Sequence, residues 1–388
     1  MENKQHFTSL QPKTSLQDCK QQVATTDTTV NLGGVKEVSP QSVKGGRIEY
    51  IDALRGFTMI LVVMWHISPS CLPSVNNISY NSIMAQFRMP LFFFVSGFVF
   101  YKDIIWDRFT FVSFMKKKIP VQILTPTVFL LLYVYIKDLP VIGVLTHSAR
   151  YGYWFTYTLF LYFIFYLFIT FISQILKINS KGNCFMLLVW GGVCYAVTLI
   201  GDIVLKNNDF SGSLLMIQWR YFIFFAVGVM AKKYFKSFQE FLENQYVMLF
   251  IITFYILSNI FDNYIFGVNG VIDIFLRHIR DFSGVFIVFA FFRKYSSAFT
   301  KEKVLGRALQ YVGRRTLDIY LLHYFFLPVG LASVFTFFAD NELPSLEIFV
   351  SLFVALLIIC LCLIISNVYR LSPWIEQYMF GVKKKKGT

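Results

Sequence analysis

Charged residues are scarce in this sequence. Only 15% of its 388 residues are Asp, Glu, Lys or Arg, whereas 56% are hydrophobic and 19% are aromatic. A soluble domain usually has about 25% charged residues, because its surface has to face water. We therefore expect a chain that folds in a lipid bilayer.

Sequence motifs of soluble enzymes and of metal sites are also missing. The six cysteines are scattered, with no CxxC pair and no Cys/His cluster at metal-ligand spacing. The sequence has no HxxxxD motif, nucleophile elbow, glycine-rich phosphate loop or zincin motif. We predict no disulfide, no bound metal and no soluble catalytic fold.

Acidic residues are the minority charge, since 36 Lys and Arg against 22 Asp and Glu give a formal net charge of +14. Such a charge often indicates nucleic-acid binding. Here, however, the basic residues sit in short loops between apolar runs rather than on one basic and aromatic surface. We predict no nucleic-acid partner and attribute the basic residues to membrane topology.

Long apolar runs follow one another from about Tyr50 to Leu371. They predict an all-α, polytopic integral membrane protein with about ten transmembrane helices. One run is short for a full crossing, unless its helix begins further back, near Ile272. The expected helices centre on residues 57–68, 84–100, 119–136, 154–176, 185–205, 220–234, 246–266, 282–292 (the short run), 317–338 and 348–368.

The basic residues also orient these helices. Lys and Arg concentrate in every second loop, and positively charged loops stay on the cytoplasmic side. We therefore expect a multi-pass protein of the cell membrane, with both termini in the cytoplasm and an even number of crossings. The opposite loops carry Lys137, Arg150, Lys206, Arg220, Arg277 and Arg280.

Two polar segments flank the membrane domain that we expect at residues 47–371. Residues 1–46 are rich in Gln, Thr, Ser and Lys and have no apolar signal-peptide core, which predicts a disordered cytoplasmic tail. Residues 372–388 are predicted to form a basic cytoplasmic tail. The four lysines at 383–386 would anchor it at the anionic inner leaflet.

The first apolar segment, YIDALRGFTMILVVMWH, carries three ionisable residues. Arg55 and His66 are eleven residues apart, close to three helical turns, so they lie on one face about 16 Å apart. Asp52 is placed to pair with Arg55 on that face. Neutral His66 suits a general base for acyl transfer, and Arg55 suits an anionic donor. Alternatively, Asp52 and Arg55 only anchor the helix, and His66 only hydrogen-bonds to a neighbour.

Three further residues are candidates for substrate binding, each with a structural alternative. Arg88, which precedes Met-Pro, either snorkels to the interface or faces a polar cavity. Trp154 either belongs to an interfacial aromatic belt or forms the floor of a sugar site. His323 lies five residues after Asp318 and is either a packing residue or a catalytic one.

A basic triplet stands before the third expected helix. Lys116, Lys117 and Lys118 are most simply positive-inside anchors. They also stand where a cytoplasmic polyphosphate would dock, which makes them candidate donor-binding residues.

Four stretches together resemble the acyltransferase 3 family of membrane acyltransferases, which modify cell-surface carbohydrates and other acceptors. The stretches occur in the family's order and span roughly residues 47–370. They are YIDALRGFTMILVVMWH, FRMPLFFFVSGFVF, RYFIFFAVGVMAKKYF and VGRRTLDIYLLHYFF.

The resemblance implies ten membrane helices, an acyl-CoA donor taken from the cytoplasm and a hydroxyl acceptor that is often extracytoplasmic. By this resemblance His66 is the catalytic base and Arg55 is essential for handling the donor. The sequence departs from the family pattern at Arg88, where histidine often stands. It also departs at the basic triplet, where lysine replaces arginine and disfavours bidentate phosphate contact.

The leading hypothesis is a membrane O-acyltransferase. It would move an acetyl or similar short acyl group from acyl-CoA, as co-substrate, to a hydroxyl of a cell-surface or lipid-linked carbohydrate, with His66 as base and no bound cofactor. The expected partners are therefore acyl-CoA, the carbohydrate or glycolipid acceptor and the lipid bilayer. The alternatives are an exporter of a polysaccharide or lipid-linked glycan, in which the same buried charges line a path, and a non-catalytic scaffold.

Overall fold

The computed structural model describes residues 48–71, 79–104, 106–146, 150–205, 218–260, 270–328, 337 and 344–380. All regular structure in these residues is helical, which confirms the all-α prediction. The tail predicted at 1–46 lies outside the described residues, as do the four lysines at 383–386.

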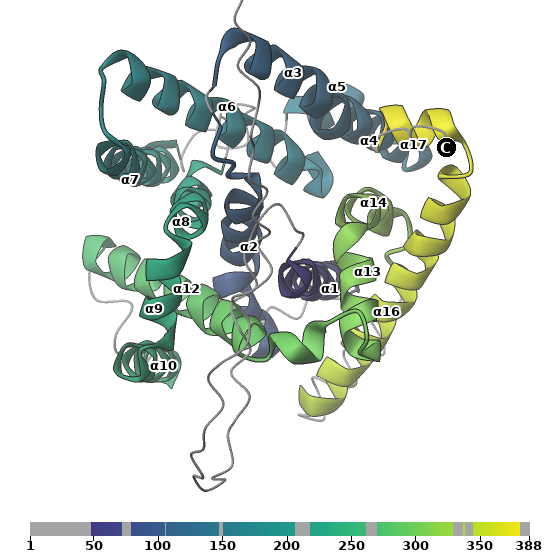
Figure 1. Ribbon diagram of the computed structural model, residues 1–388. Coiled ribbons are helices and arrows are strands. Elements are labelled where there is room, and N and C mark those ends of the chain that lie inside the picture. Colours follow the sequence, from purple (N-terminus) through teal and green to yellow (C-terminus); the bar gives the residue numbers. More distant parts are fainter. Residues whose placement is uncertain are drawn as a thin grey trace, which may run out of the picture. The chain divides into compact units, whose positions relative to one another are not determined.

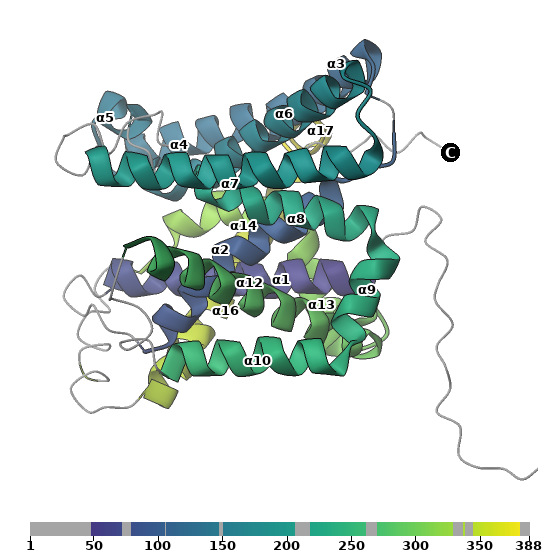
Figure 2. The ribbon, with the colours of Figure 1, turned by 90° about the vertical axis from the view of Figure 1, so that its left-hand side faces the viewer.

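The first two helices run through the middle of the unit. They are α1 (Glu49–Cys71) and α2 (Ser79–Phe100). Helix α1 is seen end-on beside α2 in Figure 1 and lengthwise in Figure 2. Helix α2 continues through Pro90, which transmembrane helices tolerate because neighbouring groups satisfy the freed carbonyl.

The third span is longer than the sequence predicts. Helix α3 (Arg108–Ile119), a π-helical turn (Pro120–Leu124) and α4 (Thr125–Ile136) follow one another without a break. The π-turn coincides with Pro120, whose ring does not fit a regular helical ladder. Asp107 caps the start of α3 by accepting a 2.8 Å hydrogen bond from the Thr110 amide. The helix expected at 119–136 therefore begins earlier, at Arg108.

The next helices are α5 (Val141–Thr146), α6 (Trp154–Ile175) and α7 (Ser180–Leu205). Figures 1 and 2 agree that α3, α4, α6 and α7 lie on one side of α1. The predicted starts and ends of α6 and α7 agree with the structure to within a few residues.

Short helices build the following part of the chain. A 3₁₀ turn (Trp219–Tyr221) leads into α8 (Phe222–Lys233), and α9 (Phe235–Glu243) joins α10 (Gln245–Ile260) at a bend of 71°. Helix α12 (Gly270–Lys294) begins well before residue 282, which confirms the longer of the two alternatives for that run.

The predicted helix at 317–338 is not one continuous helix. Helix α14 (Thr316–Leu322) passes into a 3₁₀ turn (His323–Phe325), and residues 326–328 are not helical. Residues 329–336 and 338 of the predicted helix lie outside the described residues. Before α14 stands α13 (Val304–Arg314), which lies between the helices expected at 282–292 and 317–338. Helix α13 packs closely against α1, and Figure 1 shows the two side by side.

Two helices complete the described chain. They are α16 (Pro344–Tyr369), which lies along the right-hand side of Figure 1, and α17 (Pro373–Tyr378). The Thr125 hydroxyl donates a 2.8 Å hydrogen bond to the Met379 carbonyl. The segment predicted as a basic tail from residue 372 therefore begins with a packed helix.

Several described helices are long and apolar enough to cross a membrane. Five spans meet this criterion among the described residues, and the bent pair of α9 and α10 makes a sixth. These spans support a polytopic membrane protein. The number of about ten crossings and the cytoplasmic placement of both termini stay predictions. The five spans are Glu49–Ile67, Ile83–Phe100, Arg108–Ile136, Trp154–Ile175 and Ser345–Tyr369.

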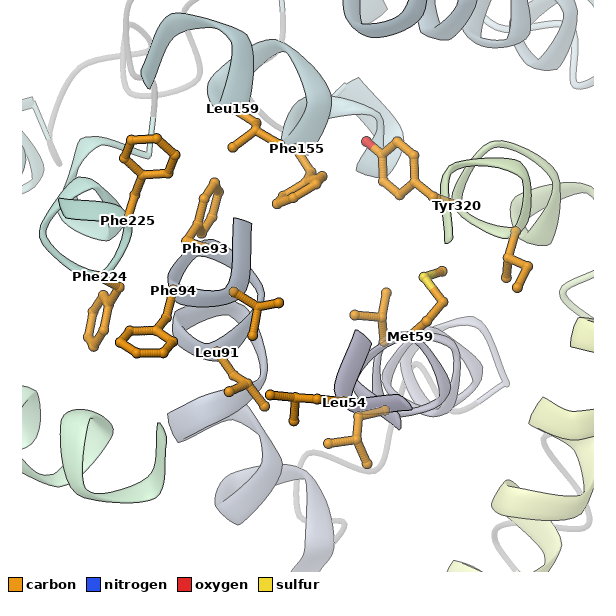
Figure 3. Close-up of a cluster of buried hydrophobic side chains, with 14 of the residues drawn as sticks. Leu54, Met59, Leu91, Phe93, Phe94, Phe155, Leu159, Phe224, Phe225 and Tyr320 are labelled. Carbon is orange, nitrogen blue, oxygen red and sulfur yellow. The ribbon is translucent and has the colours of Figure 1, made fainter. Parts of the chain in front are cut away.

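Aromatic side chains fill the interior around α2. Figure 3 shows Phe93 between α8 and α6, where it faces Phe225 and Phe155, while Leu91 points toward Leu54 of α1. The ring centroids of Phe93 and Phe155 are 4.9 Å apart, and Phe93 is completely buried. Dispersion and ring packing hold such helices together in lipid, where water supplies little driving force.

Glycine contacts set the distance between two pairs of helices. A Cβ added at Gly56 of α1 would overlap the Leu309 carbonyl of α13, and one at Gly313 would overlap the Asp52 carbonyl. A Cβ at Gly97 of α2 would likewise overlap the Phe225 carbonyl of α8. Small residues let helix backbones approach closely in membranes. Helix α1, which carries three of the predicted site residues, is therefore held tightly against α13.

Candidate active site

Three polar side chains meet where α1 approaches the end of α14. The His66 Nε2 and the Tyr324 hydroxyl are 3.1 Å apart. The ring centroids of His66 and His323 are 5.2 Å apart, and those of His323 and Tyr324 are 3.9 Å apart. The structure therefore brings together two histidines that are 257 positions apart in the sequence.

The two histidines differ in accessibility and in bonding. His323 is completely buried, and its Nδ1 lies 3.0 Å from the Ile319 carbonyl. A carbonyl only accepts hydrogen bonds, so Nδ1 carries the proton and Nε2 is an acceptor. His66 is only half-buried. Because a general base has to reach its substrate, His66 suits that role and His323 suits a supporting one.

A glycine makes room for the tyrosine that contacts His66. Gly152 has a φ of +96°, which glycine adopts readily, and a Cβ at this position would overlap the Tyr324 hydroxyl. The 3₁₀ turn that carries Tyr324 is wound more tightly than α14, which changes the direction of its side chains. These two local features place the hydroxyl beside the imidazole.

Two further tyrosines fix the end of α14 against the start of α6. The Tyr153 hydroxyl donates to the Leu321 carbonyl at 2.7 Å, and the Tyr320 hydroxyl donates to the Gly152 carbonyl at 2.9 Å. Figure 3 shows the Tyr320 hydroxyl directed toward α6. Each buried hydrogen bond of this kind stabilises the fold by about 1 kcal/mol. The tyrosines therefore hold His323 and Tyr324 in place.

Arg88 lies next to the part of α1 that carries His66. Its side chain is only 8% exposed, and its guanidinium carbon is 4.1 Å from the ring centroid of Trp65, the residue before His66. Its charge also acts on His66 and on Tyr324. Arg88 is therefore packed inside the structure against Trp65, and its role in substrate binding stays a prediction.

Trp154 belongs to an aromatic stack next to this region. Its ring stacks on that of Tyr221 at a centroid distance of 6.2 Å, and Tyr221 stacks on Phe93 at 5.4 Å. The charge of Arg88 acts on Tyr221 as well. Trp154 is thus packed in an aromatic stack with Tyr221 and Phe93.

Arg55 lies on α1 near the start of α14. Its Nη2 donates a 2.9 Å hydrogen bond to the Thr316 hydroxyl, and its Nη1 is 3.8 Å from Asp52 Oδ1. The predicted pairing of Asp52 with Arg55 is therefore confirmed. Since Thr316 contacts Arg55 and His323 contacts His66, α1 and α14 run parallel. Arg55 and His66 stand about 16 Å apart along α1.

The three lysines of the basic triplet have different environments. Lys116 and Lys117 are exposed, whereas Lys118 is half-buried and its Nζ lies 5.1 Å from the ring centroid of Phe163. Lys118 is also close enough to Arg55 and Lys102 for mutual repulsion. Of the triplet, Lys118 joins a group of cations that includes Arg55.

Asp318 has a structural partner. Arg370 donates to both of its carboxylate oxygens, at 2.8–2.9 Å, and the Ser366 hydroxyl also donates to it. This pair ties α14 to the end of α16. Asp318 is therefore engaged in packing, with Arg370 and Ser366 as its partners.

Tyr324 and Thr316 are the site residues that sequence reasoning missed. A tyrosine directly after an intramembrane histidine was a weak signal for Tyr324, because tyrosines are common in this chain. Thr316 gave no signal, since its contact with Arg55 depends on the packing of α14 against α1.

A family model described as an acyltransferase domain matches residues 48–366, which include both histidines and Arg55. No curated protein and no solved structure matches the chain.

Proposed function

Because this chain belongs to the acyltransferase 3 family and is an acyltransferase, we propose a specific reaction for it. It transfers an acetyl or similar short acyl group from acyl-CoA to a hydroxyl of a cell-surface or lipid-linked carbohydrate. The observation that carries this proposal is the half-buried His66, whose Nε2 faces the Tyr324 hydroxyl.

His66 acts as the general base in this mechanism. With its Nε2–H donating to the Tyr324 hydroxyl, its Nδ1 takes the proton of the acceptor hydroxyl while the hydroxyl oxygen bonds to the thioester carbonyl carbon. The carbon–sulfur bond then breaks, and the departing CoA thiolate receives the proton from the imidazolium. The reaction needs no metal, because a thioester is already activated toward attack. Tyr324 and His323 hold the imidazole in position.

Arg55, Lys118 and Lys102 handle the donor. Three neighbouring cations repel one another, and an anion placed among them removes that repulsion. CoA carries phosphates at one end and its thioester at the end of a long flexible arm. Phosphates held near Arg55 leave the arm to cover the distance of about 16 Å to His66.

The predicted topology assigns each end of this site to one side of the membrane. With both termini in the cytoplasm, α1 runs outward, so Arg55 faces the compartment that supplies acyl-CoA. His66 then lies nearer the compartment of the carbohydrate. Arg88, which stacks on the neighbour of His66 in the sequence, and Trp154, in the aromatic stack with Tyr221, are the candidate acceptor-binding residues.

Label transfer tests the proposal. Purified protein in liposomes is incubated with radiolabelled acetyl-CoA and a crude cell-surface glycan fraction, and label in the glycan is counted. We expect incorporation by the wild type and a loss of at least about 100-fold in His66→Ala. Movement of glycan across the vesicle without label transfer from any short acyl-CoA would refute the enzymatic reaction. A folded His66→Ala variant with full transfer would refute only the role of His66.

A further inference from the structure

Arg88 is a buried cation, and two of its three side-chain nitrogens make no hydrogen bond in the described part of the chain. Its Nε and Nη1 are both inaccessible to solvent and make no hydrogen bond there. The Trp65 ring below it provides a cation–π contact, which satisfies none of the N–H donors. A guanidinium does not lose its charge in proteins, so Arg88 cannot avoid this situation by deprotonation.

The position of Arg88 makes its charge relevant to the reaction. It acts on the His66 imidazole and on the Tyr324 hydroxyl that contacts it. A nearby positive charge opposes the formation of an imidazolium, which His66 has to become when it accepts a proton. The positive charge of Arg88 therefore opposes proton uptake by His66 unless a negative charge neutralises it.

A bound anion would accept hydrogen bonds from the unsatisfied N–H groups of Arg88. It would also cancel the positive charge that opposes protonation of His66. The donor phosphates do not fill this role in the proposed arrangement, since they sit near Arg55, about 16 Å along α1. The anion next to His66 then belongs to the acceptor.

We propose that Arg88 binds an anionic group, a carboxylate or a phosphate, of the carbohydrate that receives the acyl group. This inference rests on the proposed function and names its substrate class: an acidic sugar or a phosphorylated glycan. The anionic group itself does not react. It neutralises Arg88 and leaves His66 free to take the hydroxyl proton, so that the enzyme selects charged acceptors over neutral ones.

Acceptor pools of matched composition test the inference. The crude glycan fraction is separated by anion exchange into neutral and acidic pools. Part of the acidic pool is carbodiimide-activated and reduced, which converts its carboxylates to alcohols, and another part is treated with phosphatase. We expect the acidic pool to accept label at least about 30-fold more efficiently, per mole of sugar, than the neutral pool. Loss of this advantage after carboxyl reduction identifies a carboxylate, and loss after phosphatase treatment identifies a phosphate.

Substitutions connect the preference to Arg88. Arg88→Gln should bring the ratio of acidic to neutral labelling close to one, and Arg88→Lys should retain part of it because the charge remains. Arg293→Gln is the matched control, since Arg293 pairs with the exposed Glu243 at 2.5 Å and lies outside the site. It should keep the wild-type ratio.

Several results would overturn the inference alone. Equal labelling of neutral and acidic pools by the wild type is sufficient, and it requires no variant to fold. A preference that persists in folded Arg88→Gln, or that follows the charge of the acyl group when succinyl-CoA replaces acetyl-CoA, would also overturn it. Absence of label in every pool with every donor would instead refute the proposed function.

Discussion

The contact between α1 and α13 predicts the effect of a single added methyl group. Gly56 is in the interior of α1, and a Cβ there would overlap the backbone carbonyl of Leu309 on α13. Ordinary Cβ contacts lie at 3.4–4 Å, so in Gly56→Ala the two helices have to separate. Backbone atoms cannot rotate aside as the end of a flexible side chain can.

A matched control isolates the magnitude of this effect. Gly192 is in the interior of α7, and an added Cβ there meets nothing within 4 Å. Both substitutions gain about 1 kcal/mol of intrinsic helix propensity. Only Gly56→Ala carries the cost of overpacking, about 1–3 kcal/mol. We therefore expect Gly56→Ala to be less stable than Gly192→Ala by about 1–3 kcal/mol.

Thermal unfolding in detergent, followed by the loss of the monodisperse peak in size-exclusion chromatography, measures this difference. At roughly 2 °C per kcal/mol for a chain of this length, the midpoint of Gly56→Ala should lie about 2–6 °C below that of Gly192→Ala. Acyl transfer should also fall in Gly56→Ala, since Arg55 shifts with the helix. Equal midpoints, or a higher midpoint for Gly56→Ala, would show that α1 and α13 are not in backbone contact.

Three further substitutions test the site and its supports. Tyr324→Phe should lower kcat by about 3–10-fold without changing the KM for acyl-CoA, because one neutral hydrogen bond to the imidazole is lost; steady-state kinetics with unchanged kcat would contradict this. Asp318→Ala should lower stability by about 2–3 kcal/mol, measured by thermal unfolding, because the hydrogen bonds from Arg370 and Ser366 are lost and Arg370 keeps, among the described residues, only its ion pair with Glu376 at 3.5 Å; a wild-type midpoint would disprove that account. Lys118→Gln should raise the KM for acyl-CoA by about 10–100-fold, whereas the exposed Lys117→Gln should have little effect; similar KM values for the two variants would remove Lys118 from the donor site.

The sequence predicts those parts of the site that depend on one helix. The spacing of Arg55 and His66 places them on one face of α1 whatever surrounds it, and the pairing of Asp52 with Arg55 follows from the same periodicity. Apolar composition likewise predicts most helices, because backbone groups in lipid have to bond within their own segment.

Contacts between distant segments could not be predicted in this way. The meeting of His66 with His323 and Tyr324 depends on how α14 packs, and no local pattern encodes that register. The basic triplet shows the same limit, since successive helical residues point about 100° apart and only packing decides that Lys118 turns inward. Helix α13 was missed because its polar residues resemble those of a basic loop.

The contact of α1 with α13 and α14 also has a consequence for how the protein is made. Arg55 bonds to Thr316, which is 261 positions further along the chain. At about 5–20 residues per second, Thr316 leaves the ribosome roughly 13–50 s after Arg55. During that interval α1 is in the membrane with the face around Gly56 uncovered and Arg55 without its later partner. Helix α1 therefore gains its packing partners α13 and α14 only late in synthesis. In a chain truncated before α13, the face around Gly56 stays exposed to other membrane helices and to quality control.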